Sequence, residues 1–367
     1  MIGSQQIPAR RYDVALLDLD GVVYLAEQPV PGAPAALAAA REAGMRLAFV
    51  TNNASRTPDQ VAALLVRVGV PAEPTEVVTS SQAAAHYLAD RLPVGAPVLV
   101  LGTTGLIEAV TERGLTPVFS ADEQPAAVVQ GFFPDIAWKH LAEGALAINR
   151  GVLWLATNLD ATVPSPRGTL PGNGSMVAAL SHATGVQPAA TGKPDPAMHA
   201  ESVERSGAQD PIVVGDRLDT DIEGARRVGC ASMLVLSGVT TPADLLTAGP
   251  LHRPDYLGAD VSALLRPQPE VLDADGRTSC GAVTVRVEGR SLILTVASGG
   301  GDGGGSGDGD GLDGLRALLV AAWRLADDGV ELEAIRADGP AAAELLASLD
   351  LPARLIRGDP GGRAGGG

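Results

Sequence analysis

Short apolar runs alternate with longer Ala- and Leu-rich helical patterns from near the start of the chain to about residue 265. The helical stretches PAALAAAREAG, TPDQVAALLVRVG and DIEGARRVG each close on a glycine, as a helix C-cap does. Strands that are apolar throughout and alternate with helices are typical of a parallel sheet covered on both faces. The pattern therefore predicts an α/β fold. The candidate strands are residues 14–20, 45–52, 96–102, 125–131, 153–158, 211–216 and 230–236.

The charge of the chain argues against several classes of partner. The formal net charge is -16 and the sequence pI is about 4.7. Such a chain repels nucleic acid and anionic lipid, so we expect neither as a main partner, and an anionic substrate would need a strongly positive local trap. Cys230 and Cys280 are too few for a disulfide framework or a metal cluster. Because we find no signal peptide and no apolar stretch long enough to span a bilayer, we expect a soluble, cytoplasmic protein.

Beyond residue 267 the pattern changes. CGAVTVRVEGRSLILTVA alternates like an antiparallel hairpin with its turn near Glu288-Gly289. A glycine- and aspartate-rich segment, 298–314, follows and is typical of a flexible linker. Its aspartates lack the order of an EF-hand loop, which argues against a calcium site. LRALLVAAWRLADDG and PAAAELLASLD then predict two helices, so residues 268–367 are expected to form a small C-terminal α+β domain.

Polar residues of particular kinds stand where four of the α/β strands end. They are Asp18 and Asp20, Thr51 with Asn52 and Asn53, Lys193, and Asp216 with Asp221 just beyond it. Ligands bind at the carboxyl ends of the strands in parallel α/β sheets, so we expect these groups to converge. Clustered carboxylates repel one another unless a cation lies between them, and oxygen ligands suit Mg²⁺. A lysine and a threonine hydroxyl beside them would complete a trap for a phosphate dianion.

Each of these features also has a structural interpretation. An aspartate at a strand end is often a turn former or helix N-cap. The Thr51-Asn52-Asn53 segment would fit as a cap for the helix entered near Pro58. Asp221 lies between Thr220 and Glu223, which have the spacing of a capping box. Lys193 alone would pass for a surface charge, although Lys139 is the only other lysine of the chain. Taken together and in this order, the residues favour a phosphate site.

At DLDGVVY, VTNN, TGKP and GDRLDTDI the sequence resembles the haloacid dehalogenase superfamily of phosphatases, and its NagD-like branch in particular. The resemblance covers about residues 11–265. It implies a Rossmann-like core interrupted between the second and third motifs by a large α/β cap. We therefore expect a core of residues 1–93 and 188–267 and a cap domain of residues 94–187.

The resemblance also implies roles for the motif residues. Asp18 would be the nucleophile that forms an aspartyl-phosphate, and Asp20 would protonate the leaving oxygen and then activate water. Mg²⁺ would be held by the Asp18 carboxylate, the Asp20 backbone carbonyl and Asp216, with support from Asp221. Lys193 would neutralise the nucleophile and the phosphoryl group, a task for a compact ammonium on a flexible stem.

Phosphate and substrate contacts are implied in two places. Thr51, Asn52 and Asn53 would bind phosphate oxygens. The stretch TNLDATVPSPRGTLPGNGSMVAAL resembles the specificity loop of the family, and its pattern is closer to the glycerol- and glycolate-phosphate members than to the pyridoxal type. The candidate contacts in it are Asn158, Asp160, Arg167 and Asn173.

These observations predict an Mg²⁺-dependent phosphatase of small phosphate monoesters, with glycerol 3-phosphate or a similar polyol or glycolate phosphate as substrate. The alternatives are a broad-specificity sugar- or nucleotide-phosphate phosphatase and, from another class, a phosphoryl-accepting signalling module. The second is disfavoured because a receiver does not need a carboxylic acid two residues beyond its nucleophile. The C-terminal part is compatible with a degenerate acyltransferase-like fragment, to which we assign no activity. We expect it to pack against the core or a partner in a homodimer.

Overall fold

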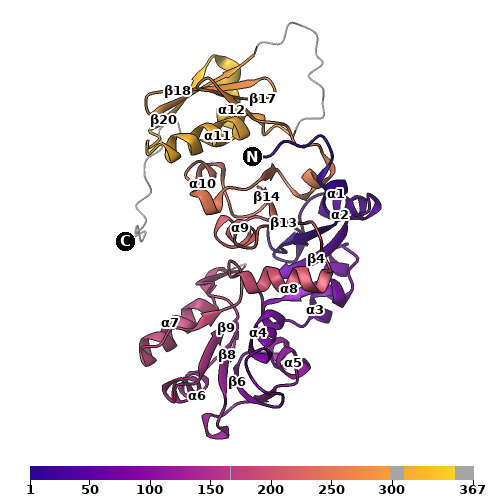
Figure 1. Ribbon diagram of the computed structural model, residues 1–367, viewed down its shortest axis with the longest axis vertical. Coiled ribbons are helices and arrows are strands. Elements are labelled where there is room, and N and C mark those ends of the chain that lie inside the picture. Colours follow the sequence, from indigo (N-terminus) through magenta and orange to yellow (C-terminus); the bar gives the residue numbers. More distant parts are fainter. Residues whose placement is uncertain (166, 298–309, 352–367) are drawn as a thin grey trace.

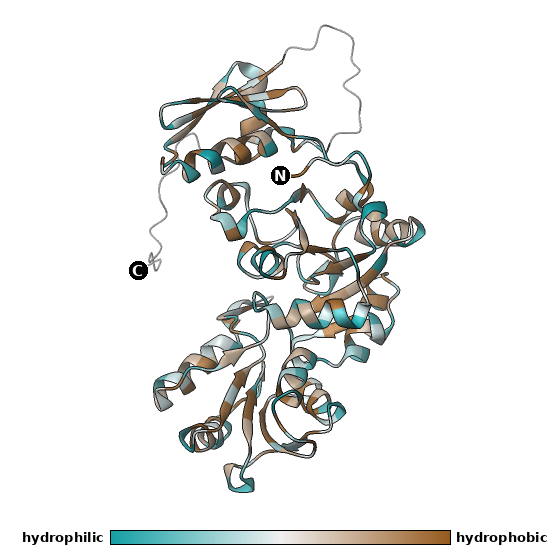
Figure 2. Ribbon diagram, in the orientation of Figure 1, coloured by the Kyte–Doolittle hydropathy of each residue, from teal (hydrophilic) through white to brown (hydrophobic). Residues whose placement is uncertain are grey.

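The computed structural model describes residues 1–165, 167–297 and 310–351. Figure 1 shows three parts stacked along the long axis of the molecule, each built on its own sheet. The most hydrophobic residues gather on the strands of these sheets, as Figure 2 shows. Within the described residues, no helix combines the length and the apolar character needed to cross a membrane.

The middle part is a six-stranded, fully parallel sheet in the order β15-β14-β13-β1-β4-β5. Its strands are β1 (Val14–Leu17), β4 (Arg46–Thr51), β5 (Val77–Thr79), β13 (Pro211–Gly215), β14 (Ala231–Val235) and β15 (Tyr256–Gly258). The α/β fold with a parallel sheet is thus confirmed. The outer strands β5 and β15 are absent from the predicted set, because three residues are too few to stand out as an apolar run.

Helices cover both faces of this sheet. Successive side chains of a strand point to opposite faces. In β1, Ala15 and Leu17 join the apolar cluster formed with α2 and α3, whereas Val14 and Leu16 join the cluster formed with α8 and α9 on the other face. All four side chains are buried, which explains why the strand is apolar throughout. The helices of this part are α1 (Pro8–Arg11), α2 (Ala33–Glu42), α3 (Pro58–Arg67), α8 (Pro196–Ser206), α9 (Glu223–Val228) and α10 (Pro242–Leu246).

A second parallel sheet, in the order β12-β9-β8-β6-β7, lies between the second and third sequence motifs. Its strands are β6 (Pro97–Leu101), β7 (Thr116–Val118), β8 (Ala127–Gln130), β9 (Leu153–Ala156) and β12 (Ala189–Ala190). Its helices are α5 (Thr104–Glu112), α6 (Trp138–Asn149) and α7 (Asn173–Thr184), and β10 (Thr162–Ser165) pairs with β11 (Gly168–Pro171) as a hairpin. We call residues 97–190 the second unit.

The helix that precedes the second unit packs against it. Leu88, on α4 (Ser80–Ala89), lies in the same apolar cluster as Val98 of β6 and Leu106 of α5. On its other side, α4 contacts α8 through Ala83, which shares a cluster with Met198. α4 therefore lies at the junction between the second unit and the middle sheet.

The C-terminal part is a five-stranded sheet in the order β16-β17-β18-β19-β20 with two helices. Its elements are β16 (Leu272–Ala274), β17 (Arg277–Cys280), β18 (Val283–Glu288), β19 (Ser291–Val296), α11 (Asp313–Asp327), β20 (Ala334–Asp338) and α12 (Pro340–Ser348). The predicted hairpin is confirmed, because β18 and β19 are antiparallel and Glu288 lies opposite Ser291. Of the predicted linker, 298–309 lies outside the described residues. Its last part is structured instead, because α11 begins at Asp313 and Asp310 pairs with Arg316.

α11 packs directly on the middle part. Trp323 donates a hydrogen bond from Nε1 to the backbone oxygen of Leu245, at 2.8 Å. Arg316, which is only 1% exposed, donates to the backbone oxygen of Leu257 at 2.7 Å. Apolar side chains of α11 form one continuous cluster with β14, β15 and α10. The C-terminal part therefore shares an apolar core with the middle part.

Candidate active site

The predicted residues come together at the carboxyl edge of the middle sheet. β1 lies between β13 and β4, and all three run in the same direction. Their carboxyl ends therefore meet, which brings Asp18 after β1, Thr51 at the end of β4 and Asp216 after β13 to one edge. Lys193 reaches the same place from the segment between β12 and α8.

Lys193 lies between two carboxylates. Its ammonium pairs with Asp18 and, at 2.7 Å, with Asp221 Oδ1, and it donates to the Val50 backbone oxygen at 3.4 Å. The residue is 5% exposed. Burial disfavours its charge, but the Asp18 and Asp221 carboxylates outweigh that effect and raise its pKa. Burial raises the pKa of Asp18 well above its usual range, although Lys193 opposes it. The lysine is thus an internal counter-ion and not a surface charge.

Thr220 and Glu223 do not form the capping box that their spacing around Asp221 predicted. Asp221 lies in a π-helical turn, Leu218–Ile222, which leads into α9. Its Oδ2 accepts the backbone N–H of Arg217 at 3.2 Å, and its Oδ1 is the partner of Lys193. A Cβ at Gly215 would come within 2.2 Å of the Asp221 Cβ. The glycine that ends β13 therefore lets this carboxylate approach the site.

Asp216 is buried with one of its oxygens unused. Oδ2 accepts the backbone N–H of Val239 at 2.7 Å, whereas Oδ1 has no hydrogen-bond partner in the described part of the chain. Burial, reinforced by the nearby Asp221 charge, raises the pKa of Asp216 to about 6. Glycines line it: a Cβ at Gly21, whose φ is +83°, would lie 2.4 Å from Oδ2, and one at Gly238 would lie 1.9 Å away. No other residue type fits at these two positions without moving the carboxylate.

Asp18, Asp216 and Asp221 form a set of donors that fits a divalent cation. Each offers one carboxylate oxygen, and these oxygens all lie within 4.8 Å of one another. Two of the three residues are buried, and the orphaned Oδ1 of Asp216 is a polar atom that a cation would satisfy. Oxygen-only donors with several carboxylates suit Mg²⁺ or Ca²⁺ rather than softer metals.

Asp20 stands apart from this carboxylate set and faces the solvent side. Its backbone forms a β-bridge with Tyr24, at the hairpin of β2 (Tyr24–Leu25) and β3 (Gln28–Pro29). Its side chain is reachable by solvent. Desolvation by the surrounding protein raises its pKa, and the charge of Arg56 opposes that rise. A carboxyl group that holds its proton more tightly than usual is suited to act as an acid.

The Thr51-Asn52-Asn53 segment mainly braces the loop that carries Lys193. Asn52 Oδ1 accepts the Lys193 N–H at 2.9 Å, and its Nδ2 donates to the Lys193 backbone oxygen at 3.2 Å. Thr51 Oγ1 accepts the N–H of Asn53 at 3.1 Å. The segment does not cap the following helix, because Thr57 caps α3 in a capping box. The side chain of Asn52 therefore positions the lysine.

The candidate residues of the second unit divide into three kinds. Asn158 and Asn173 are buried braces: Asn158 donates to the Asn52 backbone oxygen at 2.8 Å, and Asn173 donates to the Asn158 backbone oxygen at 2.8 Å. Asp160 lies beside the site, where its Oδ2 accepts from Asn52 Nδ2 at 3.4 Å, and burial raises its pKa. Arg167 is exposed in the turn of the β10–β11 hairpin.

Two contributors were missed by the sequence reasoning. Val239 supplies the amide that holds Asp216, and Ser237-Gly238 directly after the β14 strand run was the available signal. His199, on α8, is 1% exposed and has no hydrogen-bond partner within the described residues. Burial, together with the Lys193 charge, lowers the pKa of His199 to about 4, which favours the neutral imidazole near the lysine. No sequence signal distinguishes it from the other histidines.

Family models match three stretches of the chain. Residues 15–116 match the model described as haloacid dehalogenase-like hydrolase, and residues 190–264 match a HAD-hydrolase-like model. Residues 280–351 match a GCN5-related N-acetyltransferase-like domain, in line with the acyltransferase-like character predicted for the C-terminal part.

Individual relatives agree with the family models. D-glycerol 3-phosphate phosphatase of Mycobacterium tuberculosis is 48% identical over 77% of this chain and 80% of its own length. The crystal structure of glycerol phosphate phosphatase from the same organism, in complex with magnesium, matches with a TM-score of 0.84 and 41% identity over 95% of this chain and 99% of that one. Acid sugar phosphatase of Staphylococcus aureus is 37% identical over 64% of this chain and 91% of its own length. With the motif residues assembled at one sheet edge, these matches show that the chain belongs to the haloacid dehalogenase-like hydrolases.

Proposed function

We propose that the protein is an Mg²⁺-dependent phosphatase that hydrolyses small phosphate monoesters, with glycerol 3-phosphate as the preferred substrate. One observation carries the proposal: the buried Lys193 ammonium and the Asp18, Asp216 and Asp221 carboxylates share one site at the carboxyl edge of the sheet. The carboxylates can hold a divalent cation and the ammonium can hold a phosphate dianion, so a site with both kinds of group stabilises the two ligands together.

The proposed reaction has two steps. In the first, an Asp18 carboxylate oxygen bonds to phosphorus while the bond from phosphorus to the ester oxygen breaks, and Asp20 gives its proton to the departing alkoxide. In the second, water attacks the phosphorus of the aspartyl-phosphate, Asp20 takes a proton from it, and Asp18 is released with inorganic phosphate. Lys193 keeps Asp18 in place and balances the negative charge of the phosphoryl oxygens. Thr51, whose hydroxyl lies at the end of β4, is proposed to bind one of them.

We propose that magnesium is held by the carboxylates of Asp18 and Asp216 and the backbone carbonyl of Asp20, with Asp221 in support. Bound there, it would offset the charge that builds up on the phosphoryl group. The magnesium complex of the M. tuberculosis enzyme supports this choice of metal.

The substrate preference rests on the second unit and on the relatives. The 94–187 insertion is proposed to act as a cap, with its Asp160 and Arg167 toward the alcohol part of the ester. Asn53, which belongs to the core, is proposed to lie near the phosphate. Three asparagines would position the loops that make these contacts, because their side chains form hydrogen bonds with backbone groups: Asn52, Asn158 and Asn173. The 48% identity to a D-glycerol 3-phosphate phosphatase supports a small polyol phosphate. The 37% identity to acid sugar phosphatases supports the alternative, a broader sugar-phosphate range. A cytoplasmic location and a homodimer stay predictions.

A phosphate-release screen tests the proposal. Glycerol phosphates, phosphoglycolate, pyridoxal phosphate, sugar phosphates and nucleotides would be compared with Mg²⁺ and with EDTA. The Asp18→Asn variant is the blank, and Asp219→Asn, which removes a charge from an exposed aspartate near the site, is the matched control. With Mg²⁺, we expect kcat/KM to be higher for glycerol 3-phosphate than for the other esters. In EDTA, we expect no phosphate release from any of them. Release from no ester, or full release in EDTA or by Asp18→Asn, would refute the proposed function.

A further inference from the structure

Glu201 is a buried carboxylate that the proposed chemistry does not use. It lies on α8, eight residues beyond Lys193, and is 3% exposed. Burial by itself raises the pKa of this carboxyl, but hydrogen bonds from His86 and Arg205 outweigh that effect and hold its pKa below the usual value. A buried carboxylate of this kind is stable only while its partners stay in place.

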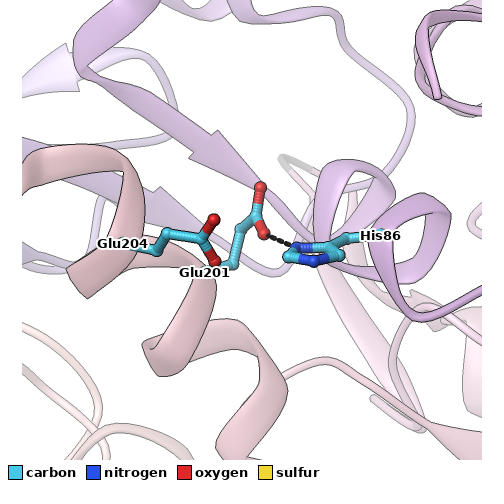
Figure 3. A group of neighbouring side chains, drawn as sticks. All are labelled: His86, Glu201 and Glu204. Carbon is cyan, nitrogen blue, oxygen red and sulfur yellow. Dashed lines mark hydrogen bonds and ion pairs between the residues drawn. The ribbon is translucent and has the colours of Figure 1, made fainter. Parts of the chain in front are cut away.

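The partners of Glu201 come from two sides. Figure 3 shows the imidazole of His86, on α4, against the carboxylate of Glu201 on α8, with Glu204 one helical turn further along. Arg113, which directly follows α5, donates from Nη2 to Glu201 Oε1 at 2.8 Å. Arg205, on α8 itself, donates to the same oxygen. Two of the three donors therefore reach across from the α4–α5 side.

The three groups drawn in Figure 3 do not add up to a metal site. His86, Glu201 and Glu204 each offer a ligand atom within 4.8 Å of the others. However, Glu201 already accepts from the guanidinium groups of Arg113 and Arg205, and these charges would repel a cation. The contacts of Glu201 are those of an anion shared among cationic donors.

The position of Arg113 gives these contacts a consequence for the site. α5 belongs to the second unit, and its first turn lies on the loop just after the Thr51–Asn53 segment. Thr103 donates to the Ser55 backbone oxygen at 2.8 Å, and a Cβ at Gly105 would come within 2.6 Å of the Arg56 backbone oxygen. The other end of α5 is tied to α8 through Arg113 and Glu201. The helix is thus fastened at both ends to elements that carry the phosphate site.

We propose that the Arg113–Glu201 ion pair sets the orientation of the second unit over the active site. The hydrogen bond between His86 and Glu201 supports it, and we call these contacts the latch. With the latch closed, the loop of Asn158 and Asp160 stays against Asn52, which in turn holds the backbone of Lys193. Arg113, Glu201 and His86 are positioning residues, since their polar side-chain contacts among the described residues are with one another and with Asp90 and Arg205, not with the carboxylate cluster. The part of this inference that concerns substrate selection rests on the proposed function.

The test compares Arg113→Gln with Arg205→Gln. Both arginines donate to Glu201 Oε1, and their side chains are 32% and 31% exposed, but only Arg113 bridges to the second unit. Hydrogen exchange of the α5 amides, followed by mass spectrometry, reads the latch directly. We expect faster exchange in 104–112 for Arg113→Gln than for Arg205→Gln, and recovery toward the wild type in Arg113→Lys, which keeps the charge.

Kinetics supply the second reading. For Arg113→Gln we expect the KM for glycerol 3-phosphate to rise about two- to fivefold, the size expected for one partly exposed ion pair, with a smaller change in kcat. Relative kcat/KM should shift toward bulkier p-nitrophenyl phosphate. A purely structural role would lower the melting temperature of both variants alike and leave KM and the α5 exchange indistinguishable, which would overturn the latch. If the wild type releases phosphate from no ester, the proposed function fails, and the exchange comparison still decides the latch.

Discussion

Asp216→Asn should stabilise the metal-free protein, although it removes a residue of the proposed metal site. The pKa of Asp216 is raised from 3.8 to about 6, and its side chain is buried. A carboxyl group whose pKa is raised in the folded state destabilises that state when it ionises. The destabilisation is fully present above pH 6 and absent below pH 3.8. At pH 7.5 a shift of about two units corresponds to roughly 3 kcal/mol. Asparagine removes this cost and keeps a carbonyl oxygen for the Val239 N–H.

The assay is thermal unfolding in EDTA at pH 7.5 and pH 5. At about 2–4 °C per kcal/mol for a chain part of this size, Asp216→Asn should melt several degrees above the wild type at pH 7.5. The difference should shrink at pH 5, where wild-type Asp216 is mostly protonated. Saturating Mg²⁺ should reverse the order at pH 7.5, because it stabilises only a protein that binds it. Asp219→Asn, three residues further along the chain and 62% exposed, is the matched control and should change little.

Two results would refute this reasoning. If Asp216→Asn melts below the wild type in EDTA at pH 7.5, the carboxylate is not electrostatically strained in the free protein. If the difference between the two proteins is the same at pH 5 and pH 7.5, it does not arise from ionisation of Asp216. Either outcome would remove the argument that the cluster is built for a cation.

Four further outcomes are expected. Asp18→Asn should lower phosphate release by at least about 10³-fold, and retained turnover would exclude it as nucleophile. Asp20→Asn should slow turnover by about 10²–10⁴-fold, most strongly for esters with poor leaving groups, and an equal effect on all esters would argue against an acid role. Lys193→Arg should reduce kcat sharply because the planar guanidinium does not fit between Asp18 and Asp221, so wild-type kcat would contradict the packing seen here. Arg316→Met should cost about 3–5 kcal/mol in urea unfolding, since it strands the Asp310 carboxylate, and a loss under about 1 kcal/mol would show that the pair is dispensable.

Much of the site was predictable because it depends on order along the chain. Asp18, Thr51 and Asp216 follow apolar runs, and the ends of parallel strands meet whatever the remaining contacts are. Lys193 was identified as a rare lysine in a glycine–proline turn that follows a strand. That strand, β12, belongs to the second sheet, so the meeting of parallel strand ends does not by itself place Lys193 at this edge. The sequence did not separate the two roles open to Asp221, because the family motif implies support of the metal, whereas Thr220 and Glu223 on either side have the spacing of a capping box.

The remaining features depend on which distant segments touch. Asn52 has the sequence context of a phosphate-binding residue, yet its amide is engaged by a backbone 141 positions away. Glu201 has no sequence signal, because a glutamate on an amphipathic helix is usually solvated, and only the approach of Arg113 and His86 makes it a junction. Asp216 Oδ2 is held by the Val239 amide beside Gly238, while Oδ1 has no hydrogen-bond partner among the described residues, and the local sequence shows neither.

The sequence alone determined the α/β class, the parallel sheet and the edge on which the chemistry lies, because the burial of strands and helices imposes a short-range pattern on neighbouring residues. Only the tertiary structure decided which of the predicted side chains contact one another and which of them are engaged by distant backbone groups. A pairing such as Lys193 with Asp18 spans 175 positions, and its energy depends on burial and distance that no local pattern encodes.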